Sequence, residues 1–106
     1  MAMIVEQRTY TVKPGSVLAY LDFYAREVME IQTKHLPQMV GYFSTEIGPL
    51  NQIIHMWGYA DFNERARCRA ALYADPAWQA VLKKLLEMIE VMETRILVPT
   101  AFSPIK

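Results

Sequence analysis

The spacing of apolar residues alternates between a strand-like and a helical period, and the order of these segments constrains the fold most strongly. Strand-like runs rich in β-branched and aromatic residues occupy residues 3–12, 40–47, 52–59 and 93–98. Helical spacing is found at residues 17–36, 61–73 and 75–92. The order predicts a ferredoxin-like α+β fold, βαββαβ, with a four-stranded antiparallel sheet and its helices on one face.

Local signals support several of these boundaries. Asp61 followed by Glu64 predicts a capped helix start, and Asp75 followed by Pro76 predicts another. The sequence Gly-Pro-Leu-Asn at residues 48–51 predicts the turn of a hairpin between the second and third strands.

Length and charge limit the classes of function. The 106 residues fit a single domain, residues 1–106. Eleven Lys and Arg balance eleven Asp and Glu, which argues against a nucleic-acid-binding protein. No apolar run is long enough to insert into a membrane, and no signal segment is evident. One cysteine, Cys68, excludes an internal disulfide, so we expect a cytoplasmic protein.

The strands carry large apolar groups on both faces, which is unusual for a sheet covered on one side. We expect the aliphatic set to pack against the helices; it comprises Val5, Phe43, Ile47, Ile54 and Met56. The opposite face would then expose Tyr10, Tyr42, Trp57 and Tyr59. Because such a patch is too large to leave in water, a homodimer is predicted, with two sheets forming a dimeric α-β barrel.

Polar residues share the aromatic face. With the first and third strands as parallel neighbours, Arg8 is expected near His55 or Trp57, and Glu6 and Glu46 could neutralise it. One interpretation is a small-ligand pocket. The other is an ion pair that only fixes the register of the dimer.

Other chemistry has less support in the sequence. His55 and Glu46 are candidate catalytic groups, although a single strand histidine is also an ordinary core residue. No metal-ligand spacing is present and no cofactor is predicted; a heme on His55 would need a roomy cavity. Cys68, between Arg67 and Arg69, could be a reactive thiol. The alternative is that Arg65 and Arg69 form a solvated basic face.

Several segments resemble the NIPSNAP family. They are Arg8–Gly15 (RTYTVKPG), Gly41–Asn51 (GYFSTEIGPLN), Arg69–Leu72 with Asp75–Trp78, and the ending Pro99–Pro104. The resemblance implies a dimeric α-β barrel and little defined chemistry. On the predicted barrel face, the residues that match the family are Arg8, Tyr10, Tyr42, Glu46 and Trp57.

The leading hypothesis is therefore a homodimeric NIPSNAP-type protein that binds a small organic molecule or a protein partner. Its predicted ligand-binding residues are Arg8, Tyr10, Tyr42, Glu46, His55 and Trp57. The alternative is a small cofactor-independent enzyme of monooxygenase or isomerase type, with His55 or Glu46 moving a proton and Arg8 stabilising an anion. A third possibility is a purely structural adaptor.

Overall fold

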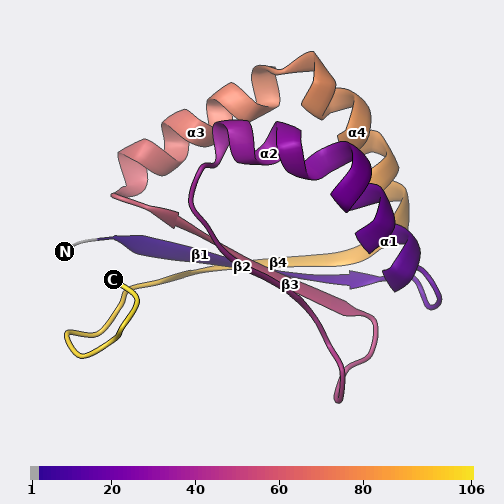
Figure 1. Cartoon of the computed structure of the whole chain (residues 1–106), viewed down its shortest axis with the longest axis horizontal. Helices are drawn as coiled ribbons and strands as arrows, with labels where there is room; N and C mark the ends of the chain where they lie inside the picture. The colour runs from indigo at the N-terminus through magenta and orange to yellow at the C-terminus, as the bar shows by residue number, and fades with distance from the viewer. Residues whose placement is uncertain (1–2) are drawn as a thin grey trace.

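The protein is described by a computed structural model that covers residues 3–106, and it folds as one sheet with helices on a single side (Figure 1). The elements, in chain order, are β1 (Ile4–Val12), α1 (Val17–Phe23), η1 (Tyr24–Val28), α2 (Met29–His35), β2 (Met39–Ser44), β3 (Gln52–Tyr59), α3 (Phe62–Ala74), α4 (Pro76–Met88) and β4 (Ile89–Leu97).

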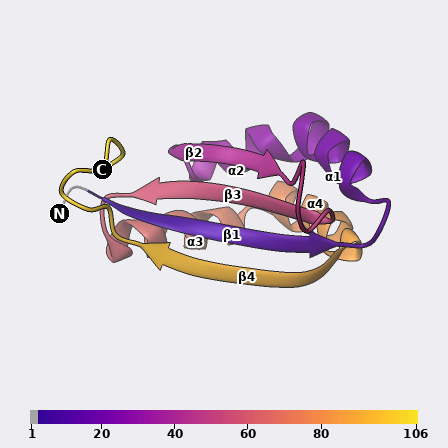
Figure 2. The same cartoon turned by 90° about the horizontal axis from the view of Figure 1, so that it is seen from below.

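The sheet has the strand order β2-β3-β1-β4, and every neighbouring pair is antiparallel. All the helices cover one face, and the opposite face, called the open face below, has no helix over it (Figures 1 and 2). At one end of the open face, Val5 is buried and lines a pocket with Pro99 and Ile105 of the C-terminal segment. The predicted ferredoxin-like α+β fold is confirmed. One detail of the prediction was wrong: β1 and β3 are central neighbours but antiparallel, because β3 returns from β2 through a hairpin.

The predicted helix starts are confirmed by their capping contacts. The Asp61 carboxylate accepts a hydrogen bond from the backbone N–H of Glu64 at 2.7 Å, and the Glu64 carboxylate accepts from the Ala60 N–H at 2.6 Å. Asp75 accepts from the N–H of Ala77 at 2.9 Å, with Pro76 at the first helical position. These contacts satisfy donors that a helix start otherwise leaves without partners.

Two strand boundaries differ from the prediction. Strand β2 ends at Ser44, and Ile47 lies in the exposed loop that follows, with 94% of its surface accessible. Strand β4 begins at Ile89, so Ile89 and Met92 belong to the sheet, although their spacing matched the preceding helix. Pairing with β1 from Val12 onward explains this, because a ladder of tertiary hydrogen bonds outweighs local helical preference.

The assignment of the two sheet faces was reversed. Trp57 and Tyr59 are each 1% exposed and pack under the helices together with Tyr10 and Ile53. Phe43, which was expected in the core, is 54% exposed on the open face. Beneath the helices, Trp57 donates to His55 and the Tyr10 hydroxyl accepts from Arg8, whereas the Tyr59 hydroxyl has no hydrogen-bond partner within residues 3–106.

Helices α1 and α2 are joined without a break by the π-helical segment η1. The buried residues of this continuous helix are Tyr20, Tyr24, Val28 and Gln32. Tyr24 donates a hydrogen bond to the side-chain oxygen of Gln32 at 2.6 Å, which satisfies two buried polar groups at once. Within residues 3–106, no helix is both long and apolar enough to cross a membrane.

Two adjacent isoleucines test the face assignment. Ile53 is fully buried under the helices, whereas Ile54 is partly exposed on the open face. Replacing Ile53 with Ala should lower the free energy of unfolding by about 2–5 kcal/mol, because it leaves a cavity in the core. The Ile54→Ala change should cost clearly less in dilute protein. Urea denaturation of both variants checks this, and equal losses would contradict the assignment.

Candidate functional site

Five of the six predicted ligand-binding residues converge in the layer between the sheet and the helices. Arg8 lies directly opposite His55 on the neighbouring strand, and Tyr42 lies opposite His55 from the other side. Tyr10 and Trp57 are buried on the same face. Glu46 is exposed in the loop between β2 and β3, outside this cluster.

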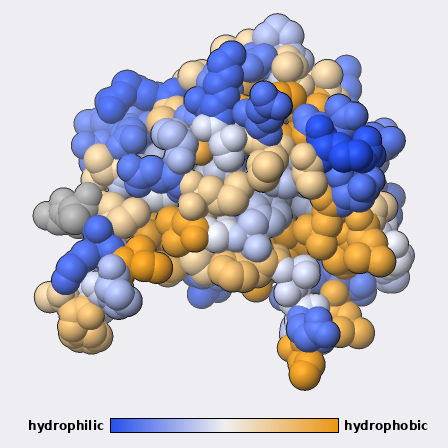
Figure 3. All heavy atoms as spheres, viewed as in Figure 1, coloured by the Kyte–Doolittle hydropathy of each residue, from blue (hydrophilic) through white to orange (hydrophobic). Residues whose placement is uncertain are grey.

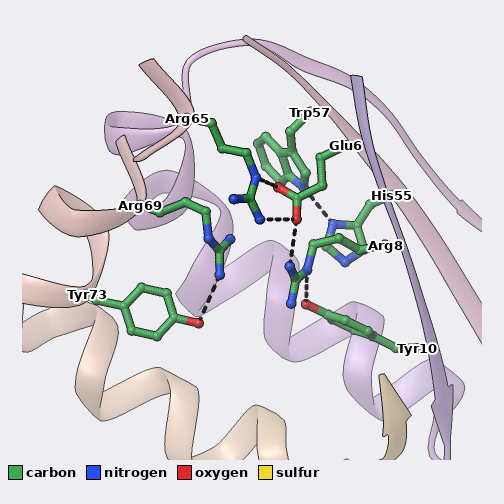
Figure 4. Close-up of polar contacts among 8 residues, drawn as sticks. All are labelled: Glu6, Arg8, Tyr10, His55, Trp57, Arg65, Arg69 and Tyr73. Carbon is green, nitrogen blue, oxygen red and sulfur yellow. Dashed lines mark hydrogen bonds and ion pairs between the residues drawn. The ribbon is translucent and has the colours of Figure 1, made fainter. Parts of the chain in front are cut away.

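A buried carboxylate organises the polar part of the cluster. Glu6 has no exposed surface, and its carboxylate lies 2.9 Å from Nη1 of Arg8 and 3.0 Å from Nη2 of Arg65. Arg65 also donates from Nε at 3.1 Å, which makes its contact bidentate (Figure 4). Burial alone would raise the pKa of Glu6, but the Arg65 hydrogen bond and the charges of Arg8 and Arg65 hold that pKa below its usual value. Glu6 therefore stays ionised in the interior.

Arg8 connects this ion pair to the aromatic residues. Its Nε donates to the Tyr10 hydroxyl at 2.8 Å, while Nη1 holds Glu6. Tyr20 and Tyr42 share a hydrogen bond of 2.8 Å at the other end of the same layer. Burial raises the pKa of Tyr20, Tyr24 and Tyr42, so their hydroxyl groups remain neutral donors and acceptors.

His55 occupies the centre of the aromatic cluster. Its ring stacks on Tyr42 with centroids 4.5 Å apart and meets the edge of Tyr10 at 4.8 Å. Trp57 donates from Nε1 to Nδ1 of His55 at 2.7 Å. Because indole is only a donor, Nδ1 must be unprotonated, so neutral His55 carries its hydrogen on Nε2. Burial, reinforced by the charge of Arg8, lowers the pKa of His55 to about 3.

Two buried N–H donors have no acceptor. Nε2 of His55 and Nε1 of Trp78 both lack a hydrogen-bond partner within residues 3–106. Both side chains line the same cavity of about 20 Å³, which lies between the sheet and the helices. That volume holds about one water molecule. Each unpaired buried donor costs about 1–3 kcal/mol of folding free energy, and an acceptor atom in this cavity would remove that cost.

The prediction missed the contribution of α3. Arg65, Arg69 and Tyr73 recur at intervals of four residues, and all three point from α3 toward Glu6, Arg8 and Tyr10 of β1 (Figure 4). Arg65 and Arg69 were assigned to a solvated basic face. The four-residue spacing of Arg65, Arg69 and Tyr73 indicates that they share one face of the helix. That this face is turned toward the sheet depends on the contact with Glu6, which lies 59 residues from Arg65 in the sequence.

Cys68 is not activated by its neighbours. Burial raises the pKa of its thiol, and the nearby charge of Glu64 acts in the same direction. The lowering effect of Arg67 is smaller. The structure therefore gives no support to the reactive-thiol interpretation.

The lowered pKa of His55 predicts a pH dependence of stability. Between pH 6.5 and pH 3 the unfolded chain binds a proton at this position and the folded chain does not. Wild-type protein should therefore lose about 1.4 kcal/mol per pH unit from this group as the pH falls through that range. In His55→Asn, whose amide can still accept from Trp57, this contribution should vanish. Urea denaturation at pH 7 and pH 5 measures the difference, and identical pH slopes would contradict it.

Known proteins match the chain along nearly its full length. The NIPSNAP family pattern matches residues 5–104. A crystal structure of a NIPSNAP family protein from Agrobacterium tumefaciens is 47% identical, with a TM-score of 0.96, and the match covers 98% of this chain and 91% of that one. A second NIPSNAP protein from that organism, of unknown function, is 46% identical with the same TM-score, over 98% of this chain and 94% of that one.

Other proteins are similar to this chain at lower sequence identity. Protein NipSnap homolog 2 of Danio rerio is 33% identical over 103 residues, which is 97% of this chain. That match covers 35% of the relative, so the chain spans about a third of its length. A putative antibiotic biosynthesis monooxygenase from Chloroflexus aurantiacus shares the fold alone, at 15% identity and a TM-score of 0.62, over 98% of this chain and 99% of that one. The family pattern across residues 5–104, together with the agreement in backbone and sequence with solved members, shows that this chain belongs to the NIPSNAP family.

Proposed function

We propose that this protein binds a small organic molecule in the aromatic pocket, the cavity lined by Tyr10, Tyr20, Tyr42, His55 and Trp78. The observation that carries the proposal is the Nε2–H group of His55, which is 1% exposed and has no acceptor among the described residues. Buried donors are nearly always satisfied in folded proteins, by protein atoms, ordered water or a ligand, so an unpaired donor at a cavity supports an acceptor atom at that position, which a ligand can supply by displacing water.

Binding requires the pocket to widen. The cavity of about 20 Å³ is far below the volume of roughly 300 Å³ at which ligand pockets begin. Its outer wall includes Tyr73, Leu86 and Met92, which are 44%, 47% and 42% exposed. Because these side chains make few buried contacts on their outer side, rotating them costs less than moving a core residue. The ligand would enter there, while the inner wall of tyrosines stays in place.

The catalytic alternative has less support. Nδ1 of His55 is occupied by Trp57 and its Nε2 carries the hydrogen, so His55 is a donor rather than a base. Glu46 lies outside the pocket, so it cannot move a proton there in this conformation. Arg8 alone retains its proposed role beside an anion. A cofactor-independent monooxygenase or isomerase therefore remains a second hypothesis.

We also propose that the protein forms a homodimer through the open face of its sheet. This face carries Phe43, Val91 and Leu97 with exposed fractions of 54%, 50% and 37%. Figure 3 shows apolar atoms along the sheet side of the molecule and at the tip of the β2–β3 loop. Glu93 and Arg95 share the face, so its local charge is balanced. A second copy suits such a surface, since a twofold contact places identical, self-complementary patches together.

The proposed barrel differs from the predicted one in its contents. The open face, rather than the face that bears Trp57, would lie between the two sheets. The aromatic pocket would remain within each subunit, under its own helices. The cytoplasmic location is likewise a proposal, supported by the single free cysteine, Cys68.

A thermal-shift screen of a metabolite library tests the binding proposal. At least one compound should raise the melting temperature of the wild-type protein, since a ligand that binds only the folded state stabilises it. The His55→Asn change should abolish most of that shift, because the shorter amide side chain withdraws the donor from the position of Nε2. The matched control is Glu46→Gln, which should leave the shift intact. A hit that His55→Asn does not affect would place the ligand elsewhere.

Sedimentation velocity tests the dimer. The wild-type protein should sediment as a dimer at micromolar concentration, and Phe43→Lys combined with Val91→Lys should convert it to a monomer, because both changes bury charge in the contact. The control is Leu18→Lys, which alters an 80% exposed apolar residue on α1 outside the sheet. A wild-type monomer would overturn the proposal.

A further inference from the structure

We propose that the ligand of the aromatic pocket is an apolar organic anion whose acid group lies between Arg8 and Arg69. The proposal rests on the proposed binding function and specifies its chemical class. Its basis is the arginine cluster, the three guanidinium groups of Arg8, Arg65 and Arg69 at the border between β1 and α3 (Figure 4).

The arginine cluster carries more positive charge than its surroundings balance. The three guanidinium groups face one carboxylate, that of Glu6. Arg65 donates from Nε and Nη2 to the two oxygens of Glu6, so this edge of its guanidinium group is occupied. Over the described chain, Arg69 forms no ion pair with a carboxylate, and its one side-chain hydrogen bond is a long contact of 3.4 Å to the Tyr73 hydroxyl. A partly buried surplus of this kind attracts an anion, since solvent screens it poorly.

Donors for that anion are already in place. Arg8 uses Nε for Tyr10 and Nη1 for Glu6, so its Nη2 makes no hydrogen bond to residues 3–106. Arg69 is held over the ring of Tyr73, with its central carbon 5.3 Å from the ring centroid. Arg8 and Tyr10 from β1 face Arg69 and Tyr73 from α3 across the space between the two elements (Figure 4). Guanidinium groups on two sides can hold one carboxylate in its plane.

The rest of the pocket defines the other end of the ligand. Arg8, Arg69 and Tyr73 line the same cavity as His55, Trp78 and Leu85. An acid group between the arginines therefore directs the body of the ligand toward aromatic and aliphatic side chains. The two unpaired N–H groups, on His55 and Trp78, would meet an oxygen atom on that body. The class is thus a small monocarboxylate with an apolar, preferably aromatic, body and an additional oxygen acceptor.

Three related probes separate the parts of this proposal. Phenylpyruvate has the carboxylate, the ring and a keto oxygen. Phenylacetone replaces the carboxylate with a methyl group, and 3-phenylpropionate lacks the keto oxygen. Isothermal titration of the wild-type protein at millimolar probe should show binding of phenylpyruvate. Each analogue should bind about tenfold or more weakly, because each lacks an acceptor that the pocket would otherwise satisfy.

A pair of arginine variants assigns the acid group to its position. Arg69→Gln should weaken phenylpyruvate about tenfold and leave phenylacetone unchanged, since only the former has a charge to lose. Arg67→Gln is the matched control: Arg67 is exposed on another face of α3 and should change neither affinity. Because the ion pairs of the buried Glu6 within residues 3–106 are with Arg8 and Arg65 and not with Arg69, replacing Arg69 should leave the fold intact.

The possible outcomes distinguish this inference from the function on which it rests. Phenylacetone binding as tightly as phenylpyruvate, or an Arg69→Gln variant with wild-type affinity, would overturn the anion assignment and leave the pocket standing. Failure of all three probes would overturn the inferred ligand class, whereas the library screen separately decides whether the pocket binds anything. Binding that both Arg67→Gln and Arg69→Gln weaken equally would indicate nonspecific charge attraction and would also overturn it.

Discussion

The contact between the buried carboxylate of Glu6 and the guanidinium groups of Arg8 and Arg65 is the constraint on which the site depends. It joins the central strand β1 to helix α3, two elements far apart in the sequence. Removing a carboxylate from water is costly, and such a pair adds little net stability compared with apolar packing. Its effect is on geometry: it sets the distance and rotation of α3 over the sheet. Arg69, one turn beyond Arg65, is thereby carried to the edge of the aromatic pocket.

The order of elements could be predicted from the sequence because its signals are local. Asp61 and Asp75 each indicate a helix start by capping a backbone N–H group no more than three residues away, and the turn residues 48–51 indicate a hairpin. The end of α4 could not be located in this way, because Ile89 is as compatible with the helix as with the strand. Pairing with Val12 decides in favour of the strand, and that partner lies at the other end of the chain.

The composition of the site was predictable, but its surroundings were not. Strand alternation correctly groups Arg8, Tyr10, His55 and Trp57 on one face, since alternate side chains share a side. Which face the helices cover depends on whether polar tips can be satisfied in the interior. Hydrophobicity alone favours Phe43 for the core, but the structure leaves it exposed on the open face. Trp57 and Arg8 lie beneath the helices instead, where both form hydrogen bonds. Their partners lie two residues away on the same strands, so their spacing places them on one face but does not show that the helices cover that face. The contact that depends on another element is the one between Arg65 of α3 and Glu6.

The π-helical segment η1 has a consequence for how the first helix meets the sheet. Its inward side chains, Tyr20, Tyr24, Val28 and Gln32, recur at a constant interval of four. In an unbroken α-helix, that interval drifts by about 40° at each step, so the last member would rotate away from the first. The wider turn of η1 takes more residues per revolution and cancels the drift. Removing one residue from this segment would restore ordinary α-helical winding and still leave Gln32 on the same side as Tyr20, since eleven residues complete about three turns. The segment η1 is thus the place where this helix accommodates one extra residue without turning its buried side away from the sheet.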